Sequence, residues 1–379
     1  MNVIIKKRLI NKLLITLFVV VSIMFPNDIY NMKKLIFILL IIVNIKHIMI
    51  QIFYRKYRWC LFFGFIFPIG LFLYSVLLTS DLLNSFTRSY PAFLILIVII
   101  IDYYYIDYEN ILLKSIEVLA IIIILIALLD IINIIDVNSG PIRDFIYAHE
   151  IGYIGKSCQY PFYYKIFIKS SPLLVFLLFK SFNDSHHILA AMTTVSLILS
   201  GTRANILFSI ILLIIFYLNN QSLITKCNII IISIIALVFM LPEFIELFQY
   251  IFITKGASSD IVRIGHLQGI SELIQNKPSI IITGSGMGSY FYSYGRNAEV
   301  NTIELSYIDL WRQMGIFFFI LFNIFIISPI FNINNSMYKK MAYMSYLLIA
   351  MTNPLLYNST SFLVYIYMYY RNVTYSKSN

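Results

Sequence analysis

Long apolar runs constrain the fold of this chain more than any other feature of its sequence. Stretches rich in Ile, Leu and Phe, each about 17 to 25 residues long, recur roughly a dozen times, and helices of that length cross a bilayer. Backbone groups in lipid need partners within a helix or a closed barrel, and runs without period-two alternation favour helices. The sequence therefore predicts an all-α, polytopic membrane protein, with spans at 9–25, 35–50, 59–78, 90–106, 111–135, 161–179, 186–200, 203–218, 224–241, 306–331, 341–356 and 359–370.

Composition and charge exclude other classes of protein. With 60% hydrophobic and 12% charged residues, the chain does not have a soluble composition. The net charge of +10 comes from Lys and Arg scattered over short connections, without the basic face that nucleic-acid binding requires. The three cysteines, Cys60, Cys158 and Cys227, lie far apart, so we expect no disulfide and no zinc site.

The charges also predict an orientation for a single integral membrane domain over residues 1–379. With about 12 spans, most Lys and Arg near the ends of the spans fall on one face, which the positive-inside rule assigns to the cytoplasm together with both termini. Lys33, Lys34 and Arg88 fall on the opposite face, against the rule. Two external, periplasmic loops are then long enough to hold structure, a smaller one at 136–160 and a large one at 242–303.

The large loop begins with two stretches that have helical periodicity. PEFIELFQYIF, from Pro242, places its apolar residues on one side and suits an interfacial helix. Residues 261–276 repeat apolar positions at helical spacing and end at Asn-Lys-Pro, which predicts a second surface helix.

Candidate functional residues lie where charge meets the apolar runs, and each has a structural alternative. Arg203, in SLILSGTRANIL, is either a snorkelling interfacial arginine or a functional guanidinium lining a wet cavity. Gly284, Gly286 and Gly288, in SIIITGSGMGSYF, form either a phosphate-binding loop or a flexible turn. His149, beside Glu150, lacks the partners of a metal site and is expected to be a loop histidine.

Glu304 lies at the start of the next predicted membrane helix, in NTIELSYIDLWRQMGIFFF. Asn301 followed three residues later by Glu304 is a capping-box pattern, which would make the glutamate a helix cap. A carboxylate near several arginines could instead accept a proton from a hydroxyl group. Arg312 lies three residues after Asp309, a spacing at which the two side chains would pair on a helix.

Three of these segments, taken in order, resemble the O-antigen ligase and O-antigen polymerase superfamily. SLILSGTRANIL resembles its Ser-x-Ser/Thr-Arg motif, and DIVRIGHLQGISELIQNKPSIIITGSGMGSYF resembles the succession of arginine, helix and Gly-x-Gly in its large loop. TIELSYIDLWRQMGIFFF resembles the segment that closes that loop. Ligases typically carry a His-Asn pair about 11 residues before the final glycine, where this chain has Glu304, so the resemblance favours the repeat-unit polymerases.

The resemblance implies a GT-C-like glycosyltransferase in the bacterial cytoplasmic (inner) membrane, with its active site facing the periplasm. It would polymerise undecaprenyl-diphosphate-linked oligosaccharide repeat units into O-antigen or capsule. Arg203 and Arg263 would then be catalytic, because guanidinium forks bind phosphate oxygens, and Glu304 would be the base. Substrate binding would fall to Arg143, His149, Arg296, Gly284, Gly286 and Gly288.

We expect no metal or other cofactor, because arginines would neutralise the diphosphate. The partners implied are lipid-linked oligosaccharides, membrane lipid and a polysaccharide chain-length regulator. Alternatives are an O-antigen ligase acting on a lipid A core, or a flippase that transports lipid-linked oligosaccharide. The transporter class usually shows internal repeats, which this sequence lacks.

Overall fold

The computed structural model of the chain describes residues 2–79, 81–157, 164–219 and 255–370. The chain is 74% helical, which confirms the predicted all-α class. Two short antiparallel hairpins are the only strands in these ranges. Five helical stretches are long and apolar enough to cross a membrane, which supports a multi-pass membrane protein: Ile29–Gln51, Arg55–Thr79, Leu82–Tyr104, Tyr108–Ile131 and Ser306–Phe331.

The first half of the described chain forms eight helices longer than one turn and two strands before residue 187. They are α1 (Asn2–Met24), α2 (Met32–Gln51), α4 (Phe67–Thr79), α5 (Leu82–Ser89), α6 (Ile97–Tyr104), α7 (Tyr108–Ile131), α8 (Pro141–Ala148), β1 (Gly152–Tyr153), β2 (Phe167–Ile168) and α9 (Leu174–Asn183). The one-turn helix α3 (Arg58–Leu61) and a π-turn precede α4.

The second half adds the remaining helices and the second hairpin. They are α10 (His187–Leu199), α11 (Arg203–Asn219), α14 (Lys255–Asn276), α15 (Ile280–Thr283), β3 (Phe291–Ser293), β4 (Ala298–Val300), α16 (Ser306–Ile327), α17 (Met337–Ala350) and α18 (Ser359–Tyr369). Three of the apolar helical stretches here are shorter than a full span: Ser171–Asn183, His187–Leu199 and Arg203–Phe216.

Helix α2 shows why the bundle suits lipid rather than water. Its apolar side chains at helical spacing are 42% to 62% exposed along one stripe: Leu35, Ile38, Leu39, Ile42, Ile45 and Met49. The opposite side of α2 is buried, and there Asn44 exchanges hydrogen bonds of 2.6 and 3.2 Å with Asn11 of α1. A continuous apolar stripe facing outward beside a buried polar pair is the arrangement expected of a helix packed in a membrane.

The centre of the bundle is α18, which is buried on every side from Ser359 to Met368. A helix that is apolar all round packs as a core helix. Its neighbourhood is rich in tyrosine, and the hydroxyl groups reach main-chain carbonyls: Tyr365 donates to Leu356 at 2.7 Å and Tyr346 to Leu355 at 3.0 Å. These bonds satisfy polar groups that would otherwise be costly to bury.

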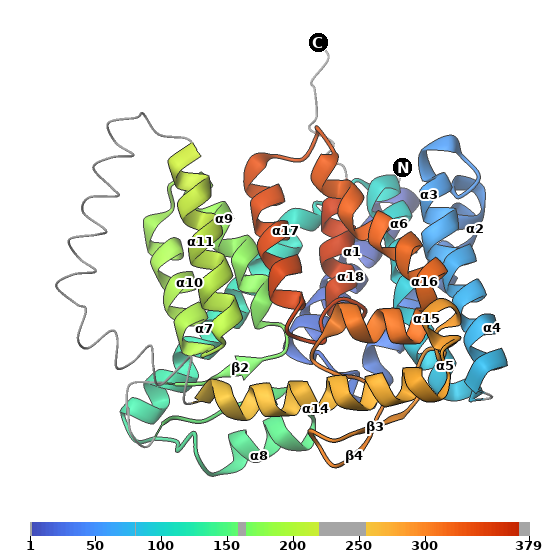
Figure 1. Cartoon of the computed structure of the whole chain (residues 1–379). Coiled ribbons are helices and arrows are strands. Elements are labelled where there is room, and N and C mark those ends of the chain that lie inside the picture. The colour runs from blue at the N-terminus through green and yellow to red at the C-terminus, as the bar shows by residue number, and fades with distance from the viewer. Residues whose placement is uncertain (1, 80, 158–163, 220–254, 371–379) are drawn as a thin grey trace.

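One end of the bundle carries the structured loops, and we call it the loop end. Figure 1 shows α14 lying across this end, roughly perpendicular to the helices of the bundle, with α8 and the β3–β4 hairpin beside it. Helix α1 begins at the opposite end of the bundle. The two external loops predicted from the sequence, 136–160 and 242–303, therefore contribute all their described elements to one end.

Several boundaries differ from the sequence prediction, and two of these differences lie at the loop end. The span expected at 161–179 is not helical at its start, because Lys165 pairs with Gly155 and Phe167–Ile168 is strand β2; the helical stretch begins only at Ser171. The surface helix expected at 261–276 is confirmed as α14, which begins earlier, at Lys255. The expected span at 224–241 and the interfacial helix that would start at Pro242 lie outside the described residues.

Candidate functional site

The predicted base and one predicted arginine meet at the loop end. Nη2 of Arg263, on α14, lies 3.3 Å from the carboxylate of Glu304, and Nη1 lies 3.3 Å from Asp260. Both members of the first pair are partly exposed, with 23% of the Arg263 side chain and 32% of the Glu304 side chain accessible. The structure thus brings together two residues that are 41 positions apart and leaves both accessible to a ligand.

The capping-box interpretation of Glu304 is wrong. Helix α16 begins at Ser306 with Leu305 at its N-cap position, and Leu305 makes no side-chain cap. Asn301 instead accepts a hydrogen bond from Arg88, 3.0 Å away. Glu304 therefore lies ahead of the helix, where it is free to act through its carboxylate.

Helix α16 is bent at Gly315, which has φ 69° and ψ 172°. A side chain there would collide with the carbonyls of Ile282 and Thr283, so only glycine allows the approach of α15. The first two turns of α16 thereby form a separate short helix at the loop end. Trp311 anchors it by donating to the carbonyl of Ile281 at 3.2 Å.

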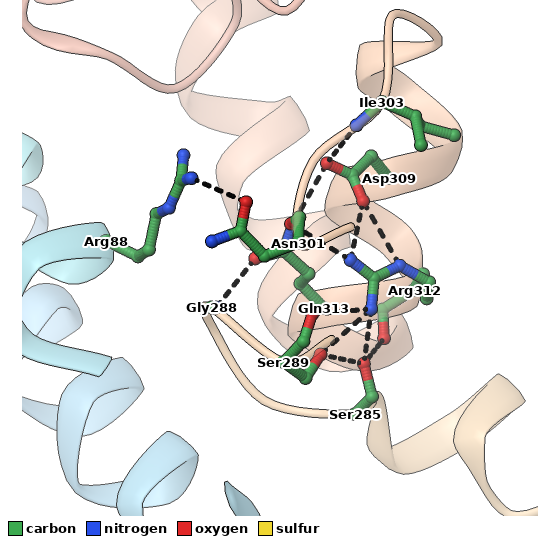
Figure 2. A network of polar contacts seen from close by, with 9 residues as sticks. All are labelled: Arg88, Ser285, Gly288, Ser289, Asn301, Ile303, Asp309, Arg312 and Gln313. Carbon is green, nitrogen blue, oxygen red and sulfur yellow. Dashed lines mark hydrogen bonds and ion pairs between the residues drawn. The ribbon is translucent and has the colours of Figure 1, made fainter. Parts of the chain in front are cut away.

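This short helix carries a buried polar network, shown in Figure 2, that the sequence prediction largely missed. Arg312 is only 1% exposed and pairs with Asp309 at 2.8 Å, as their spacing predicted. Its guanidinium also donates to the hydroxyl groups of Ser289, at 2.9 Å, and Ser285, at 3.1 Å. Because Arg312 is neutralised and enclosed, it holds the loop end together and is not a contact for substrate.

The glycine-rich run is part of the same network. Gly284, Gly286 and Gly288 all have positive φ, between 73° and 89°. Their backbone amides donate to protein acceptors: Gly284 to Ile280 at 2.8 Å, Gly286 to the main chain of Gln313 at 3.0 Å, and Gly288 to its side chain at 2.9 Å. Ser285 and Met287 also use their amides within the protein, so the loop presents no free amide for a phosphate.

Helix α14 rests on the β3–β4 hairpin through glycines spaced four residues apart. A side chain at Gly265 would overlap the backbone of Gly295, and one at Gly269 would overlap the carbonyl oxygen of Tyr292. This close approach buries Ile270 against Phe291 and Ile303. The Gly-x-x-x-Gly spacing on α14 is a sequence signal for close packing that could have located this contact.

Replacing Gly269 with alanine is expected to lift α14 from the hairpin, because the added methyl group overlaps backbone that cannot rotate away. Limited proteolysis of the purified protein should then cut the hairpin at least several-fold faster than in wild type. Ser271→Ala, an exposed change on the same helix, is the matched control and should leave the rate unchanged. Equal cleavage rates in all three proteins would contradict this packing.

His266 is on the side of α14 that faces strand β3, and it is fully buried. Its Nδ1 is 2.6 Å from the hydroxyl of Ser293, which also accepts the amide of Arg296 at 3.3 Å. Either Ser293 or Nδ1 can be the donor in this bond, depending on the tautomer of the ring. Burial lowers the pKa of His266 and the charge of Arg296 lowers it further, while Glu304 and Asp309 oppose this, so the ring is neutral.

Two buried nitrogen atoms on this side of α14 have no hydrogen-bond partner among the described residues: Nε2 of His266 and Nε of Arg263. Unpaired buried polar atoms are rare in native proteins. The two residues are three positions apart, so they lie on one side of the helix, and Arg263 also contacts Glu304. A polar ligand bound here would satisfy nitrogen atoms that the described residues leave unpaired.

The other predicted site residues have separate surroundings. Arg203 begins α11 at the loop end, two residues after Gly201, which packs on the backbone of Tyr164 and Lys165. Arg143 bonds to the carbonyl of Asn138 and lies over the ring of Tyr147, at 5.2 Å.

His149 and Arg296 lie at two other places at the loop end. The ring of His149 is 4.7 Å from that of Phe145. Arg296 is in the β3–β4 turn, close enough to affect the charge of both His266 and Lys169. Of the nine predicted residues, the structure therefore shows direct contact between side chains only for Arg263 and Glu304 within the ranges it describes.

No known protein family, curated protein or solved structure matches this chain. What the site does must therefore be argued from its own residues.

Proposed function

We propose that this protein is a glycosyltransferase of the bacterial cytoplasmic membrane that polymerises undecaprenyl-diphosphate-linked oligosaccharide repeat units. The observation that carries the proposal is the pair of Arg263 and Glu304, which lies at the loop end of an apolar helical bundle. A carboxylate and a guanidinium side by side are the two groups that transfer of a sugar from a lipid diphosphate requires. The product would be O-antigen or capsule polysaccharide.

In the proposed reaction Glu304 accepts the proton of an acceptor sugar hydroxyl as its oxygen attacks the anomeric carbon of the donor. The bond between that carbon and the diphosphate oxygen breaks, and the electron pair leaves with the diphosphate. Arg263 stabilises the developing charge through charge-assisted hydrogen bonds. When Arg263 exchanges Glu304 for the diphosphate, the carboxylate is released from the ion pair and can contact the acceptor hydroxyl.

The remaining parts of the proposal concern the membrane. About 12 spans, as the apolar runs predict, would put both termini in the cytoplasm and the loop end in the periplasm. Arg203, at the same end as Arg263, is proposed as the second arginine for the leaving diphosphate. A chain-length regulator is the partner proposed to act with the enzyme.

The proposal is tested with purified protein in lipid discs, supplied with lipid-linked repeat units whose products are resolved by length. Arg263→Ala is expected to lower elongation by about a hundredfold or more, the size of effect that loss of one transition-state donor produces. Arg263→Lys should restore little of it, because a point charge does not reproduce the bidentate fork.

The matched control is Lys277→Ala, which removes an exposed cation just beyond the end of α14 and should elongate normally. If the Arg263→Ala variant elongates repeat units at the wild-type rate, the proposal is wrong. If the wild-type protein transfers glycan to a lipid A core acceptor and does not elongate repeat units, the protein is a ligase and not a polymerase.

A further inference from the structure

Lys33, Lys34 and Arg88 are the cations that oppose the positive-inside rule, and all three lie at the loop end. Lys33 is in the first turn of α2 and is only 1% exposed. Its ammonium group donates to the hydroxyl of Ser359, 2.8 Å away, and to the carbonyl of Pro26. Among the described residues no carboxylate lies within ion-pair distance of this ammonium group. Asp28 is nearby, but its carboxylate accepts a hydrogen bond from the backbone amide of Lys33 at 2.9 Å and pairs with Lys34 at 3.9 Å.

A lysine ammonium has three donors, so one donor of Lys33 remains for another acceptor. A buried charge without a direct ion pair is costly, and proteins usually retain one where a ligand of opposite charge binds. The position of Lys33 thus points to an anion.

Further cations surround this position. Lys169 follows strand β2, lies within electrostatic range of Lys33, and has Glu150 no closer than 3.9 Å. Burial lowers the pKa of Lys169, Glu150 opposes this, and the charges of Arg88 and Arg296 lower it further. Two carboxylates, Asp28 and Glu150, also lie in this region, and they are outnumbered by the four cations Lys33, Lys169, Arg88 and Arg296.

Arg88, on α5, makes its described hydrogen bond to the neutral side chain of Asn301, at 3.0 Å. The next two residues on that helix end, Ser89 and Tyr90, are buried, and their hydroxyl groups have no partner among the described residues. A guanidinium with donors to spare and two unpaired hydroxyl groups are suited to the oxygens of a phosphate group.

We propose that Lys33, Arg88 and Lys169 bind the diphosphate of a second lipid-linked substrate, the acceptor repeat unit. This inference rests on the proposed function. Polymerisation joins two molecules that each carry a lipid diphosphate: the donor releases its group, and the acceptor keeps its own throughout. The pair of Arg263 and Glu304 serves the donor, so the acceptor requires another site for an anion at the same end of the bundle.

The test counts bound ligands on the full-length protein in phosphatidylcholine discs, with farnesyl diphosphate as the probe and native mass spectrometry as the readout. Wild type is expected to bind two equivalents. Arg88→Gln combined with Lys169→Gln should weaken one site by at least about tenfold, since hydrogen bonds from charged groups each contribute that much. Arg263→Ala should weaken the other site alone.

Lys46→Gln is the matched control, because Lys46 is an exposed lysine near the opposite end of α2. It should keep both equivalents, and the melting temperature of each variant shows whether it is folded. Lys33→Gln, made separately, should behave as the double variant does. Displacement of the probe by an equal concentration of phosphatidylglycerol would overturn the assignment to a diphosphate.

Different results would contradict the proposed function and the proposed second site. If wild type elongates repeat units but binds a single equivalent, or if the double variant keeps two, the second site is wrong. If wild type binds two equivalents, one of them sensitive to Arg88 and Lys169, but elongates nothing, the proposed function is wrong and the diphosphate site stands.

Discussion

Glu304→Gln is expected to lower the rate of elongation by about a hundredfold or more, because a general base contributes a factor of that order and an amide cannot accept the proton. The variant should still fold. Glu304 caps no helix, and its exposed pair with Arg263 contributes at most about 1 kcal/mol to the free energy of unfolding. The rate is measured with purified enzyme and lipid-linked repeat units, so that loss of expression does not imitate loss of catalysis.

Glu272→Gln provides the control for this change. Glu272 is an exposed glutamate on α14 that accepts a hydrogen bond from Tyr294 at 2.6 Å, and it is far along the helix from Arg263. Its replacement should leave elongation within about twofold of wild type, as expected for a surface position. If Glu304→Gln elongates as fast as Glu272→Gln, Glu304 is not the base.

Asp309→Asn is expected to destabilise the protein by about 3 to 5 kcal/mol, the cost of leaving a buried charge without its partner. The reason is that Arg312, only 1% exposed, would keep its charge but lose a contact of 2.8 Å to a carboxylate. The change should appear as a lower melting temperature in detergent. It should also expose the loop from Gly284 to Ser289, which Arg312 holds through two serines.

A second helical pair of nearly the same spacing serves as the control. Lys180 and Asp184 are 2.7 Å apart, but about 30% of each side chain is exposed. Asp184→Asn should therefore cost less than about 1 kcal/mol. Replacing Asp309 and Arg312 together by leucine should recover much of the loss, because it removes both charges. Equal effects of Asp309→Asn and Asp184→Asn would refute the buried-pair interpretation.

The elements that the sequence predicted best depend on local patterns. The apolar runs gave helices in the described ranges because a span in lipid is defined by its own length and hydrophobicity. Residues 261–276 gave α14, and the three-residue spacing of Asp309 and Arg312 gave their ion pair, because both patterns follow from helix geometry alone.

Contacts between distant segments could not be predicted in this way. The sequence alone allowed Asn301 and Glu304 to form a capping box, but Asn301 contacts Arg88, 213 residues away, and Glu304 contacts Arg263. The sequence allowed the glycines at 284, 286 and 288 to form a flexible turn or a phosphate loop, and the structure shows that Gln313 and Ile280 accept hydrogen bonds from their amides. The hydrogen-bond partner of each of these groups depends on which distant segment packs against it in the folded chain.

The sequence by itself therefore determined the all-α class, the apolar surface suited to a membrane, and the residue types available for chemistry. Only the tertiary structure decided which charges are neutralised and which are not. It enclosed Arg312 with Asp309, left Arg263 and Glu304 accessible, and buried Lys33 against neutral oxygens. The physical reason is that the effect of a charge depends on its partners and its exposure, and both are set by packing between segments far apart in the chain.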